Sequence, residues 1–299
     1  MQVFVTGATG YIGSAIVRDL IDAGHRVTGL ARSDAAAAAL TAAGVQAHRG
    51  ALDDADILRS AAAVSEGVIH TAFQNVGPDT DFAAACAADL QAIEVLGEAL
   101  AGSGKPLVVT SGTALLPPGR LGTEEDAGVP GFPRVASEDA ALSFAGRGVR
   151  ASVVRLAASV HSGEADKKGF VPSLIEFART SGVSAYVGDG SNRWPAVHQL
   201  DAARLFRLAL ESAPPGARLH GAAEEGVPFR DIAAALGAHL NLPVTGISPA
   251  EAEGHFSWLA RFVSIDNPTS SALTRKQFGW DPVQPELIAD IEEGHYFKD

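Results

Sequence analysis

The chain has 299 residues, of which 46% are hydrophobic, so it is long enough to bury a sizeable core and suits one domain with a smaller appended lobe. Its formal net charge of −12, with no run rich in lysine and arginine, argues against nucleic acid and an anionic membrane surface as partners. One cysteine excludes an internal disulfide and a cysteine-built metal site. Since the chain also lacks a leader-like start and an apolar run of membrane-spanning length, we expect a metal-free cytoplasmic protein.

The first thirteen residues read MQVFVTGATGYIG, which predicts a buried strand at 2–6, a glycine-rich turn and an amphipathic helix over 14–23. Each glycine has its own physical role. Gly7 permits the tight turn, Gly10 leaves room for a pyrophosphate to approach the backbone, and Gly13 lets the helix pack closely on the strand. The free N–H groups at the helix N-terminus attract phosphate, so this stretch predicts a dinucleotide site.

The second strand, at 25–31, ends in Arg32 and Ser33. Units that bind NAD usually place an acidic residue there for the ribose 2′-hydroxyl, whereas an arginine accommodates the 2′-phosphate of NADP through a charge-assisted fork. We therefore expect NADP(H) as the cofactor. The alternative is a solvated loop arginine without a ligand. A helix over 34–43 follows, with Ser33 or Asp34 as its N-cap.

Strands and helices continue to alternate through the first half of the chain. Strands are predicted at 45–50, 67–72, 106–110 and 149–156, and helices from about residue 55, at 79–103 and at 133–145. His70 lies inside a strand and is interpreted as a hydrogen-bonded core histidine. The Gly- and Pro-rich stretch at 117–131 is expected to be a flexible surface loop.

Ligands of parallel sheets bind where the strands end at their carboxyl edge, so the residues there are site candidates. Leu52 follows the third strand near the expected adenine, and Thr71, Ala72 and Phe73 stand at the end of the fourth strand. Hydroxyls at the end of the fifth strand are expected to face the nicotinamide and the substrate. They belong to Ser111 and Thr113.

In the second half the alternation loosens. Helices are expected at 172–181, 201–212 and 229–240, strands at 184–187, 194–200 and 218–221, a turn at 188–192, and a tail that is helical in pieces. Asp201 is the expected N-cap of its helix. Candidates for lining an apolar substrate pocket are Phe73, Phe170, Val171, Trp194 and Trp258.

Six segments, spread in order over nearly the whole chain, resemble motifs of the extended short-chain dehydrogenase/reductases. They are TGATGYIG (6–13), VIHTA (68–72), VVTSG (108–112), VVRLAASVHSGE (153–164), AVHQLDAARLFRLAL (196–210) and FGWDP (278–282). The resemblance implies an α/β fold with a doubly wound Rossmann sheet. It places the NADP-binding domain at 1–160 plus about 194–221, and a discontinuous substrate lobe at about 161–193 and 222–299.

The resemblance also implies a set of cofactor contacts. They are Gly7, Thr9, Gly10, Tyr11, Ile12, Gly13, Arg32, Ser33, Leu52, Thr71, Ala72, Phe73, Ser111 and Ala158. Relatives commonly form homodimers through two helices, which here correspond to 79–103 and 133–145.

One departure from the family pattern concerns its Tyr-x-x-x-Lys pair, which supplies a proton and holds the nicotinamide ribose. The matching positions hold Arg134 and Glu138. An arginine does not readily give up a proton, but it can polarise a carbonyl. The glutamate can accept ribose hydrogen bonds or act as an acid if burial raises its pKa. Alternatively, the two side chains form a surface ion pair at i, i+4 spacing. His161 is a further candidate proton donor.

These features predict an NADP(H)-dependent oxidoreductase that transfers a hydride to or from a small or hydrophobic carbonyl or alcohol. In this interpretation Ser111 and Thr113 orient the substrate oxygen, and Arg134 or His161 stands in for the absent tyrosine. One alternative is a catalytically silent NADP-binding sensor or regulatory protein, which the missing pair favours. A weaker alternative is a sugar-nucleotide epimerase or dehydratase.

Overall fold

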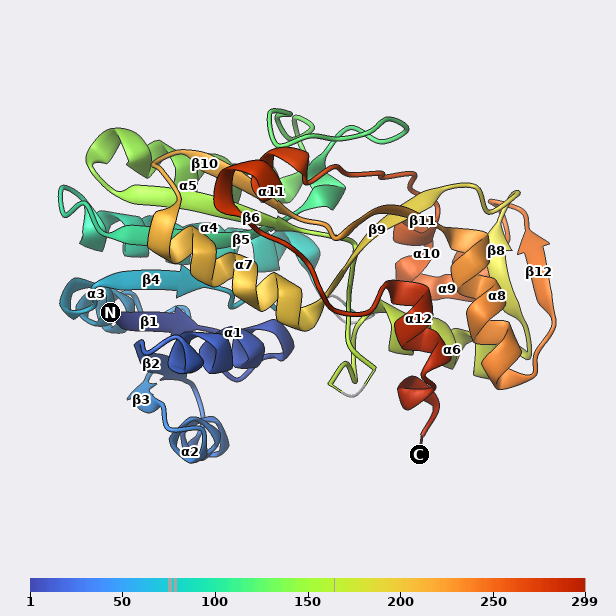
Figure 1. The fold of residues 1–299 in the computed structure, drawn as a ribbon, viewed down its shortest axis with the longest axis horizontal. Coiled ribbons are helices and arrows are strands. Elements are labelled where there is room, and N and C mark those ends of the chain that lie inside the picture. The colour runs from blue at the N-terminus through green and yellow to red at the C-terminus, as the bar shows by residue number, and fades with distance from the viewer. Residues whose placement is uncertain (75–76, 78–79, 164, 299) are drawn as a thin grey trace.

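A seven-stranded parallel sheet forms the centre of the larger lobe (Figure 1). The computed structural model describes residues 1–74, 77, 80–163 and 165–298. The strand order is β10-β6-β5-β4-β1-β2-β3, and each neighbouring pair is parallel. The strands are β1 (Gln2–Thr6), β2 (Arg26–Ala31), β3 (Gln46–Arg49), β4 (Gly67–His70), β5 (Pro106–Gly112), β6 (Arg150–Leu156) and β10 (Ala217–Gly221). This confirms the predicted doubly wound α/β fold.

Helices cover both faces of this sheet, as a parallel sheet requires. One face carries α1 (Tyr11–Asp22), α2 (Asp34–Ala42) and α7 (Gln199–Ser212), whose buried side chains share one core cluster. The other face carries α3 (Ala55–Val64), α4 (Phe82–Leu100) and α5 (Pro133–Ser143), which share a second cluster. Helix α4 is shorter at both ends than the helix predicted over 79–103. Residue 79 itself lies outside the described residues. Dimer formation through α4 and α5 stays a prediction.

The smaller lobe has its own core and two small sheets. The three-stranded sheet has the order β11-β9-β7, and β12 pairs with β8. The strands are β7 (Ser159–His161), β8 (Ser184–Val187), β9 (Arg193–His198), β11 (Glu224–Pro228) and β12 (Val244–Ile247). The helices are α6 (Phe170–Ser181), α8 (Phe229–Leu240), α9 (Ala252–Phe256), α10 (Ala260–Val263) and α12 (Leu287–Glu292). Strands β7, β11 and β12 were not predicted, because they are short and carry no clear alternation.

The start of α7 differs from the sequence prediction. The N-cap is His198, whose Nδ1 accepts a hydrogen bond of 3.2 Å from the Leu200 amide, and the helix begins at Gln199. Asp201, the predicted cap, lies inside the first turn and is 3% exposed. Its carboxylate accepts hydrogen bonds from the amides of Val283 and Gln284, so it anchors the C-terminal segment instead. The exact division of the chain into the two predicted lobes stays a prediction.

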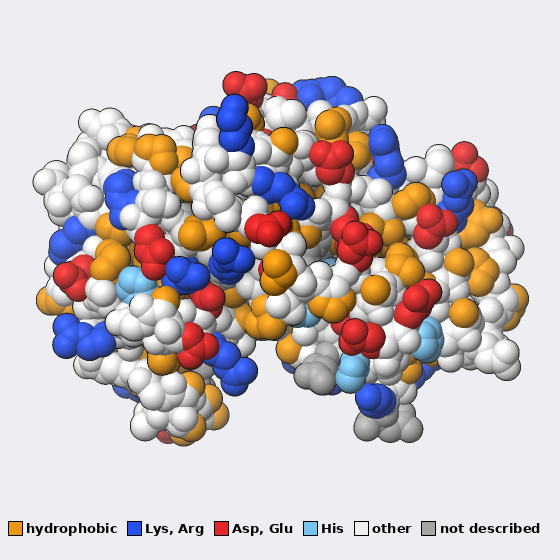
Figure 2. All heavy atoms as spheres, in the orientation of Figure 1, with side chains coloured by type: hydrophobic (Ala, Val, Ile, Leu, Met, Phe, Trp, Pro, Cys, Tyr) orange, Lys and Arg blue, Asp and Glu red, His pale blue; other side chains and the backbone are white. Residues whose placement is uncertain are grey.

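The chain crosses between the two lobes several times. After β10 it forms the smaller lobe, returns as α11 (Ala272–Phe278) to pack on α7 and β10, and then leaves again for α12 (Figure 1). Figure 2 shows charged side chains of both signs mixed over one face, with a notch between the lobes. Among the described residues, none of the helices combines the length and the hydrophobicity that a membrane crossing requires.

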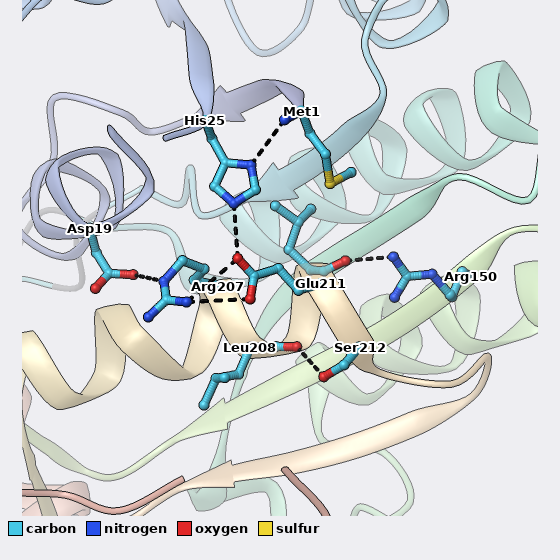
Figure 3. Close-up of polar contacts among 9 residues, drawn as sticks. Met1, Asp19, His25, Arg150, Arg207, Leu208, Glu211 and Ser212 are labelled. Carbon is cyan, nitrogen blue, oxygen red and sulfur yellow. Dashed lines mark hydrogen bonds and ion pairs between the residues drawn. The ribbon is translucent and has the colours of Figure 1, made fainter. Parts of the chain in front are cut away.

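Polar contacts on α7 fix it to the rest of the larger lobe (Figure 3). Arg207 donates to Asp19 of α1 at 2.6 Å, and Glu211 contacts His25 at 2.9 Å. Arg150 of β6 donates to the Leu210 carbonyl at 2.6 Å. Because α7 follows directly from β9 of the smaller lobe, these contacts also fix the junction between the lobes.

The stretch at 117–131 is held in place rather than free, which corrects the expected flexible loop. Gly122 forms a bridge with Thr269, and the buried carboxylate of Glu124 accepts hydrogen bonds of 2.7 Å from the amide and hydroxyl of Thr274. Arg155 of β6 donates to the Asp126 carbonyl at 2.8 Å. These partners come from distant parts of the chain, so the local composition gave no sign of them.

Candidate functional site

The glycine-rich turn packs so closely that two of its glycines have no room for a side chain. Gly7 has φ of +69°, and a Cβ there would lie 2.7 Å from the Ala72 amide nitrogen. A Cβ on Gly13 would lie 2.0 Å from the Gly7 carbonyl oxygen. The turn is thereby seated against the end of β4, where Thr71 Oγ1 donates to the Thr6 carbonyl at 2.8 Å.

The N-terminus of α1 fits a pyrophosphate. Gly10 is the N-cap and supplies no side-chain hydrogen bond, and the first intrahelical bond runs from the Ser14 amide to the Gly10 carbonyl at 2.9 Å. The amides of Tyr11, Ile12 and Gly13 therefore have no intrahelical acceptor. A Cβ on Gly10 would meet only the Gly7 carbonyl, at 3.1 Å, so the remaining space beside this amide row is open. This is the geometry that holds a dinucleotide phosphate.

The end of β2 carries positive charge. Arg32 is exposed and forms no ion pair within the described part of the chain, whereas Arg49 pairs with Asp34 at 2.9 Å. Ser33 is the N-cap of α2 and accepts from the Ala36 amide at 3.1 Å. The other predicted cofactor contacts at strand ends are all partly or fully exposed; they are Thr9, Leu52, Thr71, Ala72, Phe73 and Ala158.

Arg134 lies in the first turn of α5 and points toward β4 and β5. Its guanidinium donates to the Thr110 carbonyl at 2.7 Å, lies 3.5 Å from Asp89 Oδ2, and stacks 4.1 Å from the centre of the Phe73 ring. Its Nε is buried and has no hydrogen-bond partner in the described structure. Asp89 also contacts His70, which is buried and bonded to Thr6, so the core interpretation of that histidine is confirmed. The Nε–H of Arg134 thus lacks a partner in the described structure, and a ligand reaches this buried donor only when the side chain moves.

Glu138 does not pair with Arg134, which corrects the surface ion pair considered from the i, i+4 spacing. Its side chain is 3% exposed and accepts hydrogen bonds from Arg155 Nε at 3.0 Å, Arg218 Nε at 3.1 Å and Ser111 Oγ at 2.9 Å. Burial alone raises the pKa of this carboxyl, but the charge and hydrogen bonds of Arg155, with Ser111 and Arg218, outweigh it and lower the pKa. Glu138 is therefore an ionised structural anchor.

The two hydroxyls at the end of β5, those of Ser111 and Thr113, make different bonds from those expected. Ser111 donates its only proton to Glu138, so its oxygen can accept a hydrogen bond from a ligand but cannot donate one while that bond holds. Thr113 is fully buried and donates to Asn267 Oδ1 at 2.9 Å, and Asn267 Nδ2 donates back to the Thr113 carbonyl at 3.1 Å. Thr113 therefore fastens the C-terminal segment to the larger lobe instead of facing the nicotinamide.

His161 lies apart from these residues, at the end of β7. Its Nδ1 is 2.8 Å from Asp290 Oδ2, its ring meets His198 edge to face at 5.4 Å, and its Nε2 is buried without a partner in the described structure. Nearby Asp166 is also buried, and burial raises its pKa to about 6 despite hydrogen bonds from two backbone amides. The structure does not bring His161 into contact with Arg134 or Ser111 among the described residues.

A cavity of about 410 Å³ opens between the lobes, beside the carboxyl edge of the sheet. It is lined by Gly77, Thr80, Phe82, Ala114, Leu116, Pro118, Val129, Phe132, Trp258, Arg261, Phe262 and Ile265. We call it the aromatic cavity. Phe82 contacts both Phe132 and Phe73 edge to face, so the Phe73 ring under Arg134 packs against a lining residue of this cavity without lining it itself.

Two predicted substrate residues lie behind the cavity wall. Phe170 packs on Trp194, Trp258 and Phe262, with ring centres 5.5–6.0 Å apart, and Trp194 is only 2% exposed. They support the residues that line the cavity. Trp258, a predicted pocket residue, does line the cavity. Sequence reasoning missed Phe82 and Phe262 as lining residues, since no motif marks them. It also missed Arg155, although a charged side chain within the otherwise buried strand β6 was a usable signal. Among the described residues no group of histidine, cysteine, aspartate and glutamate is placed to hold a metal.

The sequence of this chain is similar to a known family and to individual known proteins. A model described as "NAD dependent epimerase/dehydratase family" matches residues 3–219. An uncharacterized protein of Schizosaccharomyces pombe is 48% identical over 99% of this chain and 100% of its own length. The 2-alkyl-3-oxoalkanoate reductase of Stenotrophomonas maltophilia is 28% identical, over 81% of this chain and 77% of its own.

Solved structures extend the similarity to the fold. The UDP-glucose 4-epimerase of Thermus thermophilus, in complex with NAD, superposes with a TM-score of 0.77 at 23% identity and covers 99% of both chains. A dTDP-glucose 4,6-dehydratase of Streptomyces venezuelae, with NAD bound, gives a TM-score of 0.78 at 19% identity, over 99% of this chain and 96% of its own.

Proposed function

The chain belongs to the NAD dependent epimerase/dehydratase family, and from that premise we propose that it is an NADP(H)-dependent oxidoreductase acting on a small or hydrophobic carbonyl or alcohol. The observation that carries this proposal is the aromatic cavity, which lies at the carboxyl edge of the sheet. Close to it, stacked on Phe73, is Arg134, whose Nε–H has no hydrogen-bond partner in the described structure. Reductases among its relatives, such as the 2-alkyl-3-oxoalkanoate reductase, are consistent with this reaction class.

The choice of NADP rests on Arg32. Its exposed guanidinium, without an ion pair in the described structure, stands where the adenosine ribose of a dinucleotide on this turn would lie. A 2′-phosphate would accept a fork of two hydrogen bonds from Arg32, and Ser33 could add its hydroxyl proton. We expect Arg32→Ala to weaken NADPH binding about 10-fold or more and to leave NADH binding nearly unchanged. Equal losses for both cofactors, measured by fluorescence titration, would contradict the assignment.

In the proposed reaction the protein's own residues bind and orient the substrate oxygen. When bound, the nicotinamide supplies or accepts the hydride. The Arg134 side chain shifts on substrate binding so that its Nε–H, buried and without a partner in the described structure, donates a hydrogen bond to the carbonyl oxygen, and its charge stabilises the negative charge that develops there. Because arginine keeps its proton, the final proton comes from solvent.

Ser111 and Glu138 contribute to this step through the orientation of the Ser111 hydroxyl. Glu138 holds the hydroxyl proton of Ser111, which fixes the serine oxygen as an acceptor at the end of β5. Such an acceptor suits the alcohol form of the substrate, whose hydroxyl can donate to it. Arg155 and Arg218 keep Glu138 ionised, so this orientation persists at neutral pH. Thr113 and His161 have no role in this proposal because their polar contacts lie elsewhere.

The test is steady oxidation of NADPH with a panel of aldehydes and ketones of increasing chain length. Turnover that rises with hydrophobic chain length and is lost in Arg134→Gln supports the proposal. A protein that binds NADPH but turns over no member of a broad panel contradicts it.

The saturated Glu138 cluster favours one second candidate, a catalytically silent NADP-binding sensor. A sensor has no need of a ligand-sized cavity at the nicotinamide end. We therefore favour the enzyme, and binding of NADPH without any turnover would favour the sensor instead.

A further inference from the structure

Two cavities meet at Trp258. One is the aromatic cavity, and the other is a second cavity of about 450 Å³. Gly77 and Trp258 line both, so the two cavities adjoin at these residues. We call the adjoining pair the cleft, in which the aromatic cavity is the apolar compartment and the second cavity is the polar compartment.

The charged side chains around this cleft are mainly cations. Among the described residues, Lys167, Lys168 and Arg179 line the polar compartment together with one acid, Glu176. Arg261 is the one charged residue among the described residues that line the aromatic cavity. All four cations are exposed, and within the part of the chain that the structure describes none of them forms an ion pair.

This clustering runs against the composition of the chain, which has 35 acidic and 23 basic residues. Arg261 borders the mainly apolar walls of the aromatic cavity, where its charge is screened less than on an open surface, whereas the other three cations line the polar compartment. Unpaired cations in such a place attract an anion, whereas on an open surface they would be solvated. The aromatic side chains, in contrast, offer nothing polar to most of a bound molecule.

We propose that the cleft binds a hydrophobic carbonyl compound that carries an anionic group. The apolar part occupies the aromatic cavity, and the cations around Trp258 hold the anion. This inference deepens the proposed function and rests on it for the identity of the reacting carbonyl.

The anion has two chemical sources, which differ in reach. A carboxylate on the hydrophobic chain itself would lie within the aromatic cavity and meet the fork of Arg261. The phosphates of a coenzyme A thioester would lie further out and meet Lys167 and Lys168 in the polar compartment. Both share the same requirement, a negative charge beyond the apolar body.

The first test compares three forms of one medium-chain oxo acid as substrates with NADPH: the free acid, its methyl ester and its coenzyme A thioester. We expect at least one charged form to exceed the ester about 10-fold in kcat/KM, with the advantage shrinking as salt is added. Arg261→Gln should reduce the acid-to-ester ratio, and the double variant Lys167→Gln, Lys168→Gln should reduce the thioester-to-ester ratio. Lys276→Gln, an exposed lysine on α11, is the matched control and should leave both ratios unchanged.

A second measurement separates this inference from the reductase proposal. Trp194 and Trp280 are 2% and 1% exposed, so a ligand in the cleft should change mainly the fluorescence of Trp258, which Trp258→Phe verifies. Salt-sensitive binding of a charged form without turnover supports the anion site and contradicts the reductase. A methyl ester that binds and reacts as well as both charged forms, with no variant changing the ratios, overturns the anion site and leaves the reductase intact. Absence of binding by either charged form also overturns it.

Discussion

The molecule buries two carboxylates to the same degree and treats them in opposite ways. Glu138 in the larger lobe and Asp166 in the smaller lobe are each 3% exposed. Glu138 has two arginines and a serine around it, and its pKa is lowered. Asp166 receives only backbone amides, keeps one oxygen without a partner in the described structure, and burial raises its pKa to about 6. Burial sets the cost of charge, and the partners decide whether the charge persists.

The largest effect should follow the loss of charge at Glu138. We expect Glu138→Gln to lower the free energy of unfolding by about 3–5 kcal/mol, because it leaves fully buried Arg155 without its anion. Since the folded pKa of Glu138 is depressed, the stability it provides is present above its unfolded pKa and is lost as pH falls. Urea unfolding at several pH values measures both features. Exposed Glu94→Gln on α4 is the control. A loss below about 1 kcal/mol would show that the arginines do not depend on Glu138.

The next effect concerns Arg134, one helical turn from Glu138 but outside its cluster. Arg134→Lys keeps the charge and removes the Nε donor, so we expect kcat to fall about 100-fold. The free energy of unfolding should change by less than about 1 kcal/mol, because Asp89 keeps a cation nearby. Turnover and urea unfolding are measured on the same preparation, with Arg59→Lys on α3 as the control. An equal loss of stability and activity would make Arg134 structural, like Glu138.

Asp166 should respond in the opposite sense to Glu138. Its folded pKa of about 6 lies above the ordinary value, so it stabilises the fold fully only below its unfolded pKa, and that stability is lost as pH rises toward 6. Asp166→Asn keeps an acceptor for the Gly169 amide and cannot ionise. We expect the variant to gain about 3 kcal/mol relative to the parent above a pH of about 6, and almost nothing near a pH of about 4. Exposed Asp281→Asn should show no such pH-dependent gain. A variant that is less stable at every pH would mean that the Asp166 charge is needed.

The smallest effect should come from Ser111. Ser111→Ala removes one hydrogen bond from Glu138 and leaves both arginines, so we expect a loss of about 1 kcal/mol in the free energy of unfolding. It should also move the acid limb of the stability profile upward in pH, because one cause of the lowered Glu138 pKa is gone. Ser60→Ala is the control, because Ser60 is an exposed residue on α3 whose hydroxyl also donates one hydrogen bond. An unchanged acid limb would remove Ser111 from the Glu138 cluster.

The sequence was informative where structure is local. The turn after β1 could be predicted residue by residue, because atoms within the turn or at the next strand end leave no room for a side chain at Gly7 or Gly13. Helix α8 was predicted with its exact bounds, since its apolar residues recur at helical spacing. The alternation of strands and helices likewise determined the larger sheet.

The candidate site could be predicted only in part, because its decisive contacts span the chain. Glu138 meets Arg155 and Arg218, 17 and 80 residues later, and Thr113 meets Asn267, 154 residues later. Local spacing suggested that Arg134 and Glu138 would pair. Each side chain instead contacts a stronger partner on another element. A single sequence does not show which elements the fold brings together.

The bonds that hold the 117–131 stretch have a consequence for how the protein is made. Glu124 is bound by Thr274, 150 residues later, and Gly122 by Thr269. During synthesis this stretch emerges long before its partners exist, so the polar groups that it later buries remain in water until the C-terminal region has been translated. The lobes therefore finish folding together, and a nascent chain halted before residue 269 should expose the stretch to protease although most of its sheet is already complete.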